Sequence, residues 1–340
     1  MPAGVTGAPA RGRVRDRDWE GVRLHVVSGK GGTGKTTVAA ALALALAAGG
    51  GRTLLVEVEG RQGIAQLFDV PPLPYDERQV AVAPEGGDVF ALAVDPEEAL
   101  LEYLDLYYRL GRAGKALERL GVVDFATTVA PGLRDVLLTG KAYEATRRRR
   151  DGQPVYDAVV LDAPPTGRIG RFLNVNAAVA GLAKVGPVRH HADAIMTLLR
   201  SPQTAVHLVT LLEEMPVQET ADAAAELAAA GLPVGGVVVN GVRDPLLSRD
   251  ELAAAAEGRL DPSAVTKGLL AAGLEPEDGL VTGLLATAAE QATRVAVERR
   301  ERRALGRLHR PTYELPALAD GVDLGALFTL AGELRRQGMA

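Results

Sequence analysis

Short apolar runs alternate with longer segments of helix-forming residues along most of the chain. Six runs rich in Val, Leu and Ala are expected to form β-strands, at residues 22–27, 53–58, 89–94, 155–161, 205–212 and 234–239. Their near-continuous apolar character is typical of strands that are covered on both faces. Strands that alternate with helices predict an α/β fold with a mostly parallel, doubly wound sheet.

Two helical segments exceed what a minimal α/β domain of this kind needs. Residues 96–150 and 174–200 are expected to be helical insertions that form a subdomain. Apolar side chains crowd residues 100–110 and 175–199, which fits either an ordinary core or a surface that binds a partner or client. Further helices are expected at 278–310 and 324–337, with a short strand at 312–318 between them.

The composition limits the classes of function. The chain has 340 residues, a net charge of −5 and no cysteine. The acidic balance gives no electrostatic case for a nucleic-acid partner. Without cysteine there is no disulfide or thiolate metal site, and a cytoplasmic location is expected. The longest apolar run, 38–48, is shorter than the roughly 20 residues that cross a bilayer, so we expect no integral membrane segment. Residues 1–20 are expected to be a disordered tail, and residues 21–340 a single domain.

Residues 28–37 read Ser-Gly-Lys-Gly-Gly-Thr-Gly-Lys-Thr-Thr, which is a P-loop with an additional lysine near its start. In such loops glycines let backbone N–H groups close around phosphates, a lysine contacts the β/γ-phosphates and a hydroxyl binds Mg²⁺. We therefore expect Lys35 to contact phosphates and Thr36 to bind Mg²⁺. Lys30 has no role in this minimal scheme. The rest of the loop is expected to bind the nucleotide: Gly29, Gly31, Gly32, Thr33, Gly34 and Thr37.

Polar residues at the ends of other strands complete the expected site. Asp162 ends an apolar strand and is expected to support Mg²⁺, while Gly167 follows in a loop that could turn its N–H toward a γ-phosphate. Asn240 ends the sixth strand and is expected to read the base. Arg243 stands where a guanine site carries aspartate, so adenine is favoured; the alternative for Asn240 is a strand-terminal turn.

The second strand ends near four polar residues, Glu57, Glu59, Arg61 and Gln62. A carboxylate at this edge of an open α/β sheet could orient the water that attacks a phosphate. The alternative is that these are solvated loop charges.

Together these motifs resemble the P-loop ATPases with a deviant Walker A motif. Within them the chain is similar to the ArsA family, which includes arsenite-efflux and guided-entry (tail-anchored protein targeting) ATPases, and to its bacterial, actinobacterial-type members. Residues 162–167, Asp-Ala-Pro-Pro-Thr-Gly, are similar to that family's switch II, Asp-Thr-Ala-Pro-Thr-Gly. The insertions lie where the family carries its client subdomain. Leu315-Pro-Ala-Leu318 resembles its adenine-packing segment, which implies that Pro316 contacts the base.

The resemblance implies an ATP- and Mg²⁺-dependent dimer in which Lys30 reaches the partner's phosphates. It also places Glu59 where the family's switch I has a water-orienting aspartate, and the longer side chain implies slow hydrolysis. The lack of cysteine removes both the family's zinc site and a metalloid site, and only 4 methionines weakly support a groove for apolar polypeptide clients.

Three functional hypotheses remain at this point. The first is an ATPase switch that couples its nucleotide state to a partner or client protein, as a homodimer or with a paralogous ATPase. The second is a positioning ATPase like the ParA/MinD proteins, although the last helix has only two basic residues, both at its end. The third is a weakly catalytic nucleotide-binding subunit of a heterodimer.

Overall fold

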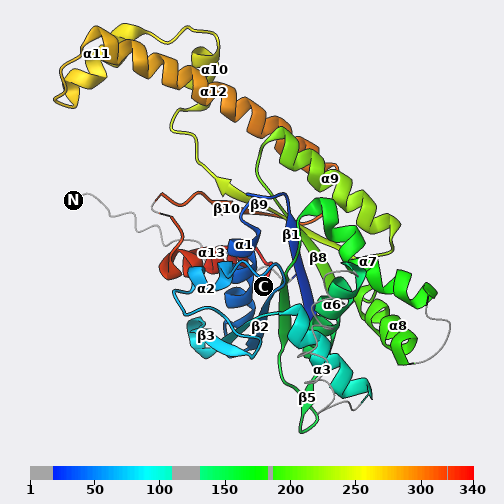
Figure 1. Ribbon diagram of the computed structural model, residues 1–340. Coiled ribbons are helices and arrows are strands. Elements are labelled where there is room, and N and C mark those ends of the chain that lie inside the picture. The colour runs from blue at the N-terminus through cyan, green and yellow to red at the C-terminus, as the bar shows by residue number, and fades with distance from the viewer. Residues whose placement is uncertain (1–17, 109–130, 183–186, 320) are drawn as a thin grey trace, which may run out of the picture.

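The computed structural model describes residues 18–108, 131–182, 187–319 and 321–340 (Figure 1). Its centre is an eight-stranded sheet with the strand order β10-β9-β8-β1-β7-β2-β4-β3. Only β3, which pairs with β4, is antiparallel. The strands are β1 Leu24–Gly29, β2 Arg52–Glu57, β3 Arg78–Val82, β4 Asp88–Ala93, β7 Ala158–Asp162, β8 Thr204–Thr210, β9 Val234–Val242 and β10 Thr312–Pro316. The six predicted strands are confirmed, and the edge strand β3 is an addition.

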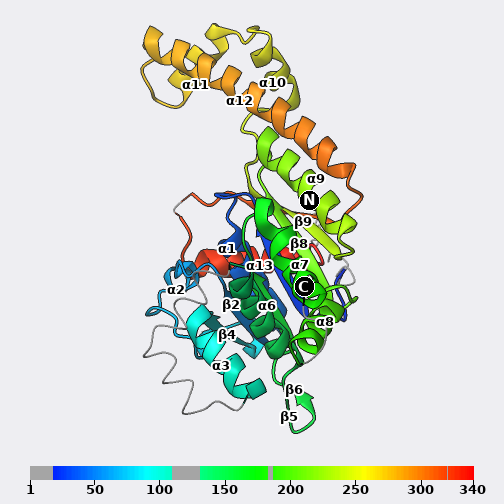
Figure 2. The same cartoon turned by 45° about the vertical axis from the view of Figure 1, so that its right-hand side comes forward.

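Helices cover both faces of the sheet, as a doubly wound fold requires (Figure 2). Successive strand residues point to opposite faces, so Leu54 joins one buried cluster and Leu55 the other. The Leu55 side is covered by α1 Lys35–Ala47, α2 Gly63–Leu67 and α13 Leu324–Arg336. The Leu54 side is covered by α3 Pro96–Tyr108, α6 Pro131–Arg147, α7 Thr166–Leu182, α8 Pro187–Leu199 and α9 Glu214–Ala229. The predicted α/β fold is therefore confirmed.

The two predicted insertions correspond to α3 with α6 and to α7 with α8. Residues 148–150 are not helical, because Arg149–Arg150 pair with Gln153–Pro154 as the short hairpin β5–β6. Asp151 and Gly152 form its turn with positive φ angles of 52° and 80°. The second helical stretch begins at Thr166, eight residues earlier than predicted.

Several apolar residues of these insertions belong to the core. Leu100 and Leu137 are buried, as are Ile195 and Leu199. For these residues the core interpretation holds, since their side chains fill the cluster beneath the sheet. The remaining predicted apolar side chains lie outside those that the structure describes: Tyr103, Leu104, Leu106, Tyr107, Tyr108, Leu110, Val179, Leu182 and Val185.

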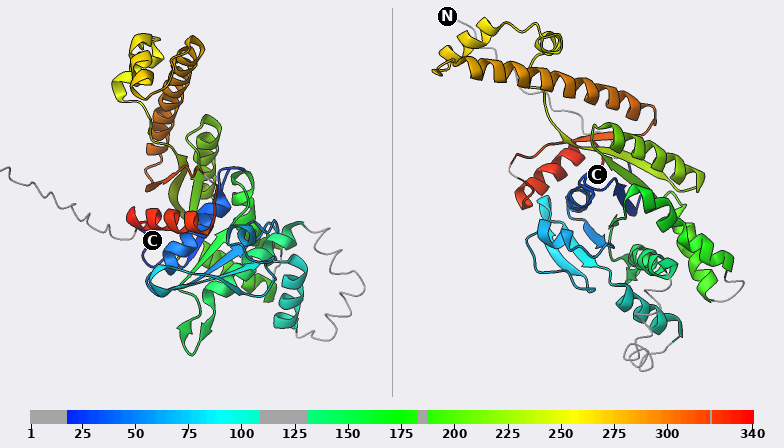
Figure 3. Two further views of the ribbon diagram at one scale, coloured as in Figure 1. Left: turned by 90° about the vertical axis from the view of Figure 1, so that its left-hand side faces the viewer. Right: turned by 45° about the horizontal axis from the view of Figure 1, so that its top comes forward.

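A helical arm separates β9 from β10 and was not predicted as a unit. It consists of α10 Arg249–Ala256, α11 Pro262–Ala271 and the long α12 Asp278–Gly306, and it projects away from the sheet (Figures 1 and 3). Its own small core contains Leu252, Ala255, Ala292 and Val295. Ser248 and Glu251 form a capping box at the start of α10, and this Ser-x-x-Glu spacing was the sequence signal for the missed helix.

The amino-terminal prediction needs one correction. Residues 1–17 lie outside the described residues, but Asp18 and Trp19 belong to the fold and not to a tail. The indole Nε1 of Trp19 donates to the Tyr313 hydroxyl at 2.9 Å, and that hydroxyl donates to Asp18 at 2.7 Å. Within the described ranges, no helix is both long enough and apolar enough to cross a bilayer.

Candidate functional site

Two glycines of the loop between β1 and α1 lie so close to neighbouring atoms that a side chain would clash there. A Cβ on Gly29 would lie 2.2 Å from the carbonyl oxygen of Val209 on the neighbouring strand. Gly34 has a φ of +86°, and a Cβ there would lie 2.3 Å from Nδ2 of Asn240. The loop therefore runs tightly between β8 and β9 before it enters α1, whose N-terminal amides are then available to an anion.

The two candidate Mg²⁺ residues meet beneath this loop. The Thr36 hydroxyl donates to Oδ2 of Asp162 at 2.7 Å, and Asp162 ends β7 beside Val27 of β1. Asp162 is 7% exposed, and among the described residues its Oδ1 has no hydrogen-bond partner. Burial raises the pKa of Asp162 to about 6, against the opposing effects of the Thr36 hydrogen bond and the Lys35 charge. A hydroxyl and a buried carboxylate with an unused oxygen fit the oxygen ligands that Mg²⁺ prefers.

Lys30 forms an ion pair within its own chain. Its Nζ lies 2.7 Å from Oε1 of Glu219 on α9, and the other oxygen of Glu219 accepts a hydrogen bond from the Thr166 hydroxyl at 3.1 Å. The Lys30 hydrogen bond holds the pKa of Glu219 below its usual range. Sequence reasoning missed Glu219, since it lies 189 residues from Lys30 and no local pattern marks it.

The polar residues at the end of β2 have different roles. Glu57 is 2% exposed and accepts hydrogen bonds from the backbone N–H groups of Gln62 at 2.5 Å and Ile64 at 3.1 Å. The Gln62 side chain is bound to the backbone of Leu73 through both its amide nitrogen and its oxygen. Glu57 and Gln62 therefore hold the turn that leads into α2.

Glu59 is the remaining carboxylate of this turn. It lies 3.8 Å from the largely exposed Arg61, and its negative charge contributes to the raised pKa of Asp162. The turn reaches the P-loop, because a Cβ on Gly63 would lie 3.3 Å from Cγ2 of Thr36. Glu59 is thus the carboxylate of this region that is free of backbone hydrogen bonds among the described residues.

A cavity of about 310 Å³ lies beside the P-loop, at the ends of β8 and β9. Asn240 lines it and donates from Nδ2 to the carbonyl oxygen of Thr33 at 2.9 Å. Pro316 ends β10 directly before Ala317, which also lines the cavity. The volume lies at the lower end of the range for small-molecule sites. Its other lining residues are Leu211, Leu212, Glu213, Gly241, Val242, Arg243, Arg294 and Glu298.

The other predicted site residues lie at the same edge of the sheet. Gly31 and Gly32 are exposed at the tip of the loop, and Thr33 is buried below it. Lys35 and Thr37 belong to the first turn of α1, with Lys35 buried. Gly167 is the second residue of α7, exposed, and a Cβ there would meet nothing within 4 Å.

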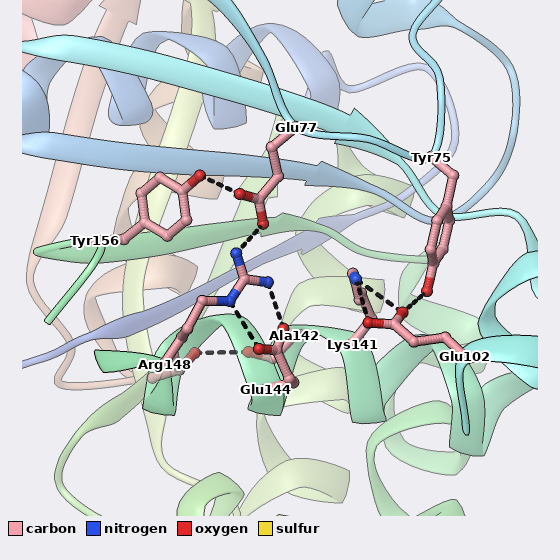
Figure 4. A network of polar contacts seen from close by, with 9 residues as sticks. Tyr75, Glu77, Glu102, Lys141, Ala142, Glu144, Arg148 and Tyr156 are labelled. Carbon is pink, nitrogen blue, oxygen red and sulfur yellow. Dashed lines mark hydrogen bonds and ion pairs between the residues drawn. The ribbon is translucent and has the colours of Figure 1, made fainter. Parts of the chain in front are cut away.

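A second polar cluster joins the first insertion to the sheet (Figure 4). Glu102 of α3 accepts hydrogen bonds from Lys141 of α6 and from the Tyr75 hydroxyl. Arg148 contacts both Glu77, at 2.7 Å, and Glu144. These charged groups are paired with one another, so the cluster anchors α3 and α6, although it borders a cavity of about 280 Å³.

Comparison with known proteins identifies relatives over most of the chain. Residues 22–200 match the family model of the ArsA ATPases, described as anion-transporting ATPase. The ATPase BagA of Mycobacterium tuberculosis is 57% identical over 320 residues, which is 94% of each chain. An arsenical pump-driving ATPase of Acidiphilium multivorum is 29% identical over 296 residues, or 77% of this chain, which spans about half (49%) of that protein. The match to more than half of the chain, together with the long BagA alignment, shows that this chain belongs to the ArsA family of ATPases.

Proposed function

We propose that this chain is a dimeric switch that binds and hydrolyses Mg²⁺-ATP and couples its nucleotide state to a partner or client protein. Membership of the ArsA family supports an ATPase. The observation that carries the proposal is the contact between Thr36 and Asp162 beneath the P-loop, with the second carboxylate oxygen of Asp162 unused among the described residues. That arrangement fits a site for a hydrated divalent cation at the phosphates.

The loop residues have separate roles in this proposal. The backbone N–H groups from Gly29 to Thr37 surround the phosphates at the N-terminus of α1, and Lys35 neutralises the β/γ-phosphates. Thr36 and Asp162 would hold Mg²⁺, which supplies neutralisation of charge on the phosphate oxygens. Gly167 would donate its N–H to the γ-phosphate. Asn240 and Pro316 would hold an adenine base in the adjoining cavity, and Glu59 would orient the attacking water.

The proposed dimer rests on Lys30. Lys35 already fills the role of the lysine within the loop, so the ammonium of Lys30 would contact the phosphates of the other subunit. ATP would then favour a closed dimer, and loss of the γ-phosphate would favour an open one. The whole of residues 21–340 would act as one ATPase domain with helical insertions. Arsenite transport is not part of the proposal, because the chain has no thiolate ligand for it.

Calorimetric titration with ATP and Mg²⁺ tests the nucleotide site. The unchanged chain is expected to bind ATP, and Lys35→Ala is expected to lose at least about 100-fold in affinity, since the charge at the phosphates is removed. Lys267→Ala on the exposed arm helix α11 is the matched control and should bind like the unchanged chain. Failure of the unchanged chain to bind ATP would refute the proposed function.

A second candidate is a subunit that holds nucleotide but mainly completes the site of a paralogous ATPase through Lys30. The sequence resemblance supports it, since that resemblance places Glu59 where the family's switch I has the shorter aspartate. Turnover of ATP by the isolated chain decides between the two candidates. Measurable hydrolysis that is lost in Glu59→Gln supports the first, and nucleotide binding without hydrolysis supports the second.

A further inference from the structure

The ion pair between Lys30 and Glu219 joins the P-loop to α9 within one chain. Lys30 Nζ and Glu219 Oε1 are 2.7 Å apart, and the two side chains are 31% and 35% exposed. Within the described part of the chain, the Lys30 ammonium donates its side-chain hydrogen bond to Glu219. The interaction is too exposed to contribute much to folding, because solvent screens such pairs. Its effect is therefore on where the Lys30 ammonium lies.

Glu219 also contacts the start of α7, shortly after Asp162. Its Oε2 accepts the hydrogen bond of the Thr166 hydroxyl at 3.1 Å, and Thr166 is 3% exposed at the start of α7. Asp162 lies four residues before Thr166, and its side chain is bound to Thr36 of the P-loop. One carboxylate on α9 therefore bridges the additional lysine of the P-loop and the segment that connects the metal aspartate to α7.

We propose that Glu219 is a positioning residue that retains Lys30 in its own subunit and releases it when nucleotide binding displaces Thr166. This inference rests on the proposed function, in which Lys30 acts on the phosphates of a partner subunit. While Glu219 of the same chain holds the Lys30 ammonium at 2.7 Å, that ammonium does not extend toward a second subunit. The ion pair with Glu219 and the closed dimer therefore compete for Lys30. Movement of residues 163–167 toward a γ-phosphate would weaken the Thr166 hydrogen bond and loosen Glu219.

The exposure of the pair sets the size of the expected effect. Partly exposed ion pairs change an equilibrium by up to about five-fold. A symmetric dimer must release Lys30 in both subunits, so the two contributions multiply to at most about 25-fold in the dimer dissociation constant. A modest effect suits a switch, because a nucleotide can overcome it through a few hydrogen bonds to its phosphates.

The test compares the dimer dissociation constants of purified variants with Mg²⁺ and a slowly hydrolysed ATP analogue, by sedimentation velocity. Glu219→Gln removes the charge that holds Lys30 but keeps an oxygen for Thr166. Glu214→Gln makes the same change of charge on the same helix, where Glu214 is paired with Arg300 instead of Lys30, and serves as the matched control. Both changes are also made together with Lys30→Met.

Glu219→Gln is expected to tighten analogue-dependent dimerisation by about 2- to 25-fold, whereas Glu214→Gln leaves it unchanged. Lys30→Met is itself expected to weaken dimerisation strongly, and Glu219→Gln should not restore it in that background, because the two residues act through one contact. The inference is overturned if Glu219→Gln leaves dimerisation unchanged or weakens it, if its effect persists without Lys30, or if no variant dimerises with nucleotide.

Affinity for the analogue, measured by calorimetry on the same preparations, separates the two failures. Loss of nucleotide binding in the unchanged chain refutes the proposed ATP site itself. Normal nucleotide binding with no response to Glu219→Gln refutes only the retention of Lys30.

Discussion

The Thr36 hydroxyl donates to the Asp162 carboxylate across 2.7 Å, although the two residues lie 126 positions apart in the chain. The parallel pairing of β1 with β7 creates this contact, because it brings the ends of both strands to the same edge of the sheet. The same edge carries the ends of β2, β8 and β9, so the P-loop is surrounded by strand-terminal residues.

Replacing Asp162 with asparagine should weaken nucleotide binding only when Mg²⁺ is present. The amide keeps the size of the side chain and an oxygen for the Thr36 hydroxyl, but it removes the negative charge next to the cation. We expect about a 10- to 100-fold loss of affinity for Mg²⁺-ATP and little change for ATP with a chelator, measured by calorimetry. Equal losses in both conditions would argue against a metal role for Asp162.

The two glutamates at the end of β2 should respond differently to substitution. Glu57→Ala leaves the buried N–H of Ile64 and the partly buried N–H of Gln62 without an acceptor, and it should lower the free energy of unfolding by about 2 kcal/mol. Glu59→Gln should change that free energy by less than about 0.5 kcal/mol but reduce ATP turnover at least about 100-fold. Urea unfolding and a steady-state phosphate-release assay measure the two effects. Glu59→Gln with full turnover would remove Glu59 from the mechanism.

Alanine at Gly34 should disrupt the P-loop while most of the fold is retained. The residue has φ +86°, and the added Cβ would lie 2.3 Å from Nδ2 of Asn240. Asn240 must then move and lose its hydrogen bond to the Thr33 carbonyl. We expect at least about a 10-fold loss of ATP affinity. Gly268→Ala on the arm helix α11 is the control, since a Cβ there meets nothing within 4 Å and the residue lies outside the P-loop. Similar affinities for both variants would contradict the loop geometry.

A buried pair of histidines should make the fold sensitive to acid. Nδ1 of His25 lies 3.1 Å from Nε2 of His207, and both side chains are fully buried between β1 and β8. Burial lowers the pKa of His25 to about 4 and lowers that of His207 well below its usual value. Between pH 4 and about 6.5 the unfolded chain therefore binds more protons than the native chain, and stability falls as the pH falls.

For His25 alone, the free energy of unfolding should decrease by about 2 kcal/mol between pH 7.5 and pH 5. Urea unfolding at the two pH values measures this difference. His25→Gln should show a smaller decrease, whereas His190→Gln, at an exposed histidine, should behave like the unchanged chain. An unchanged pH dependence in His25→Gln would mean that this pair does not control acid stability.

The sequence predicted the parts of the fold that have strong local signals. The central strands are continuous apolar runs, and the P-loop glycines mark a turn whose geometry few other residues permit. The edge strand β3, Arg78–Val82, was missed because its side chains are partly or fully exposed and carry no such run. The start of α7 was missed because Gly167 and Gly170 suggest a loop, whereas burial of Ile169 and Phe172 stabilises a helix there.

The site was predictable to the extent that its residues belong to motifs. Asp162 and Thr36 were predicted from strand ends and loop spacing, and the structure places them in contact. The sequence does not distinguish Glu57 from Glu59, because only the fold shows that Glu57 accepts hydrogen bonds from backbone amides. Glu219 lies in the second turn of an ordinary helix, and its role depends on a contact with Lys30 that only the tertiary structure creates.

Native mass spectrometry of the purified chain with ATP and Mg²⁺, with ADP and without nucleotide shows whether ATP drives dimerisation. With ATP we expect a dimer with two bound nucleotides. This dimer is a homodimer or, when the chain is purified from its own host, a pair with a second P-loop ATPase. ADP should give mainly the separate chain. Lys30→Ala should still bind ATP but remain largely undimerised. An oligomeric state that is the same in all three conditions, or full dimerisation of Lys30→Ala, would contradict an ATP-driven switch that depends on Lys30.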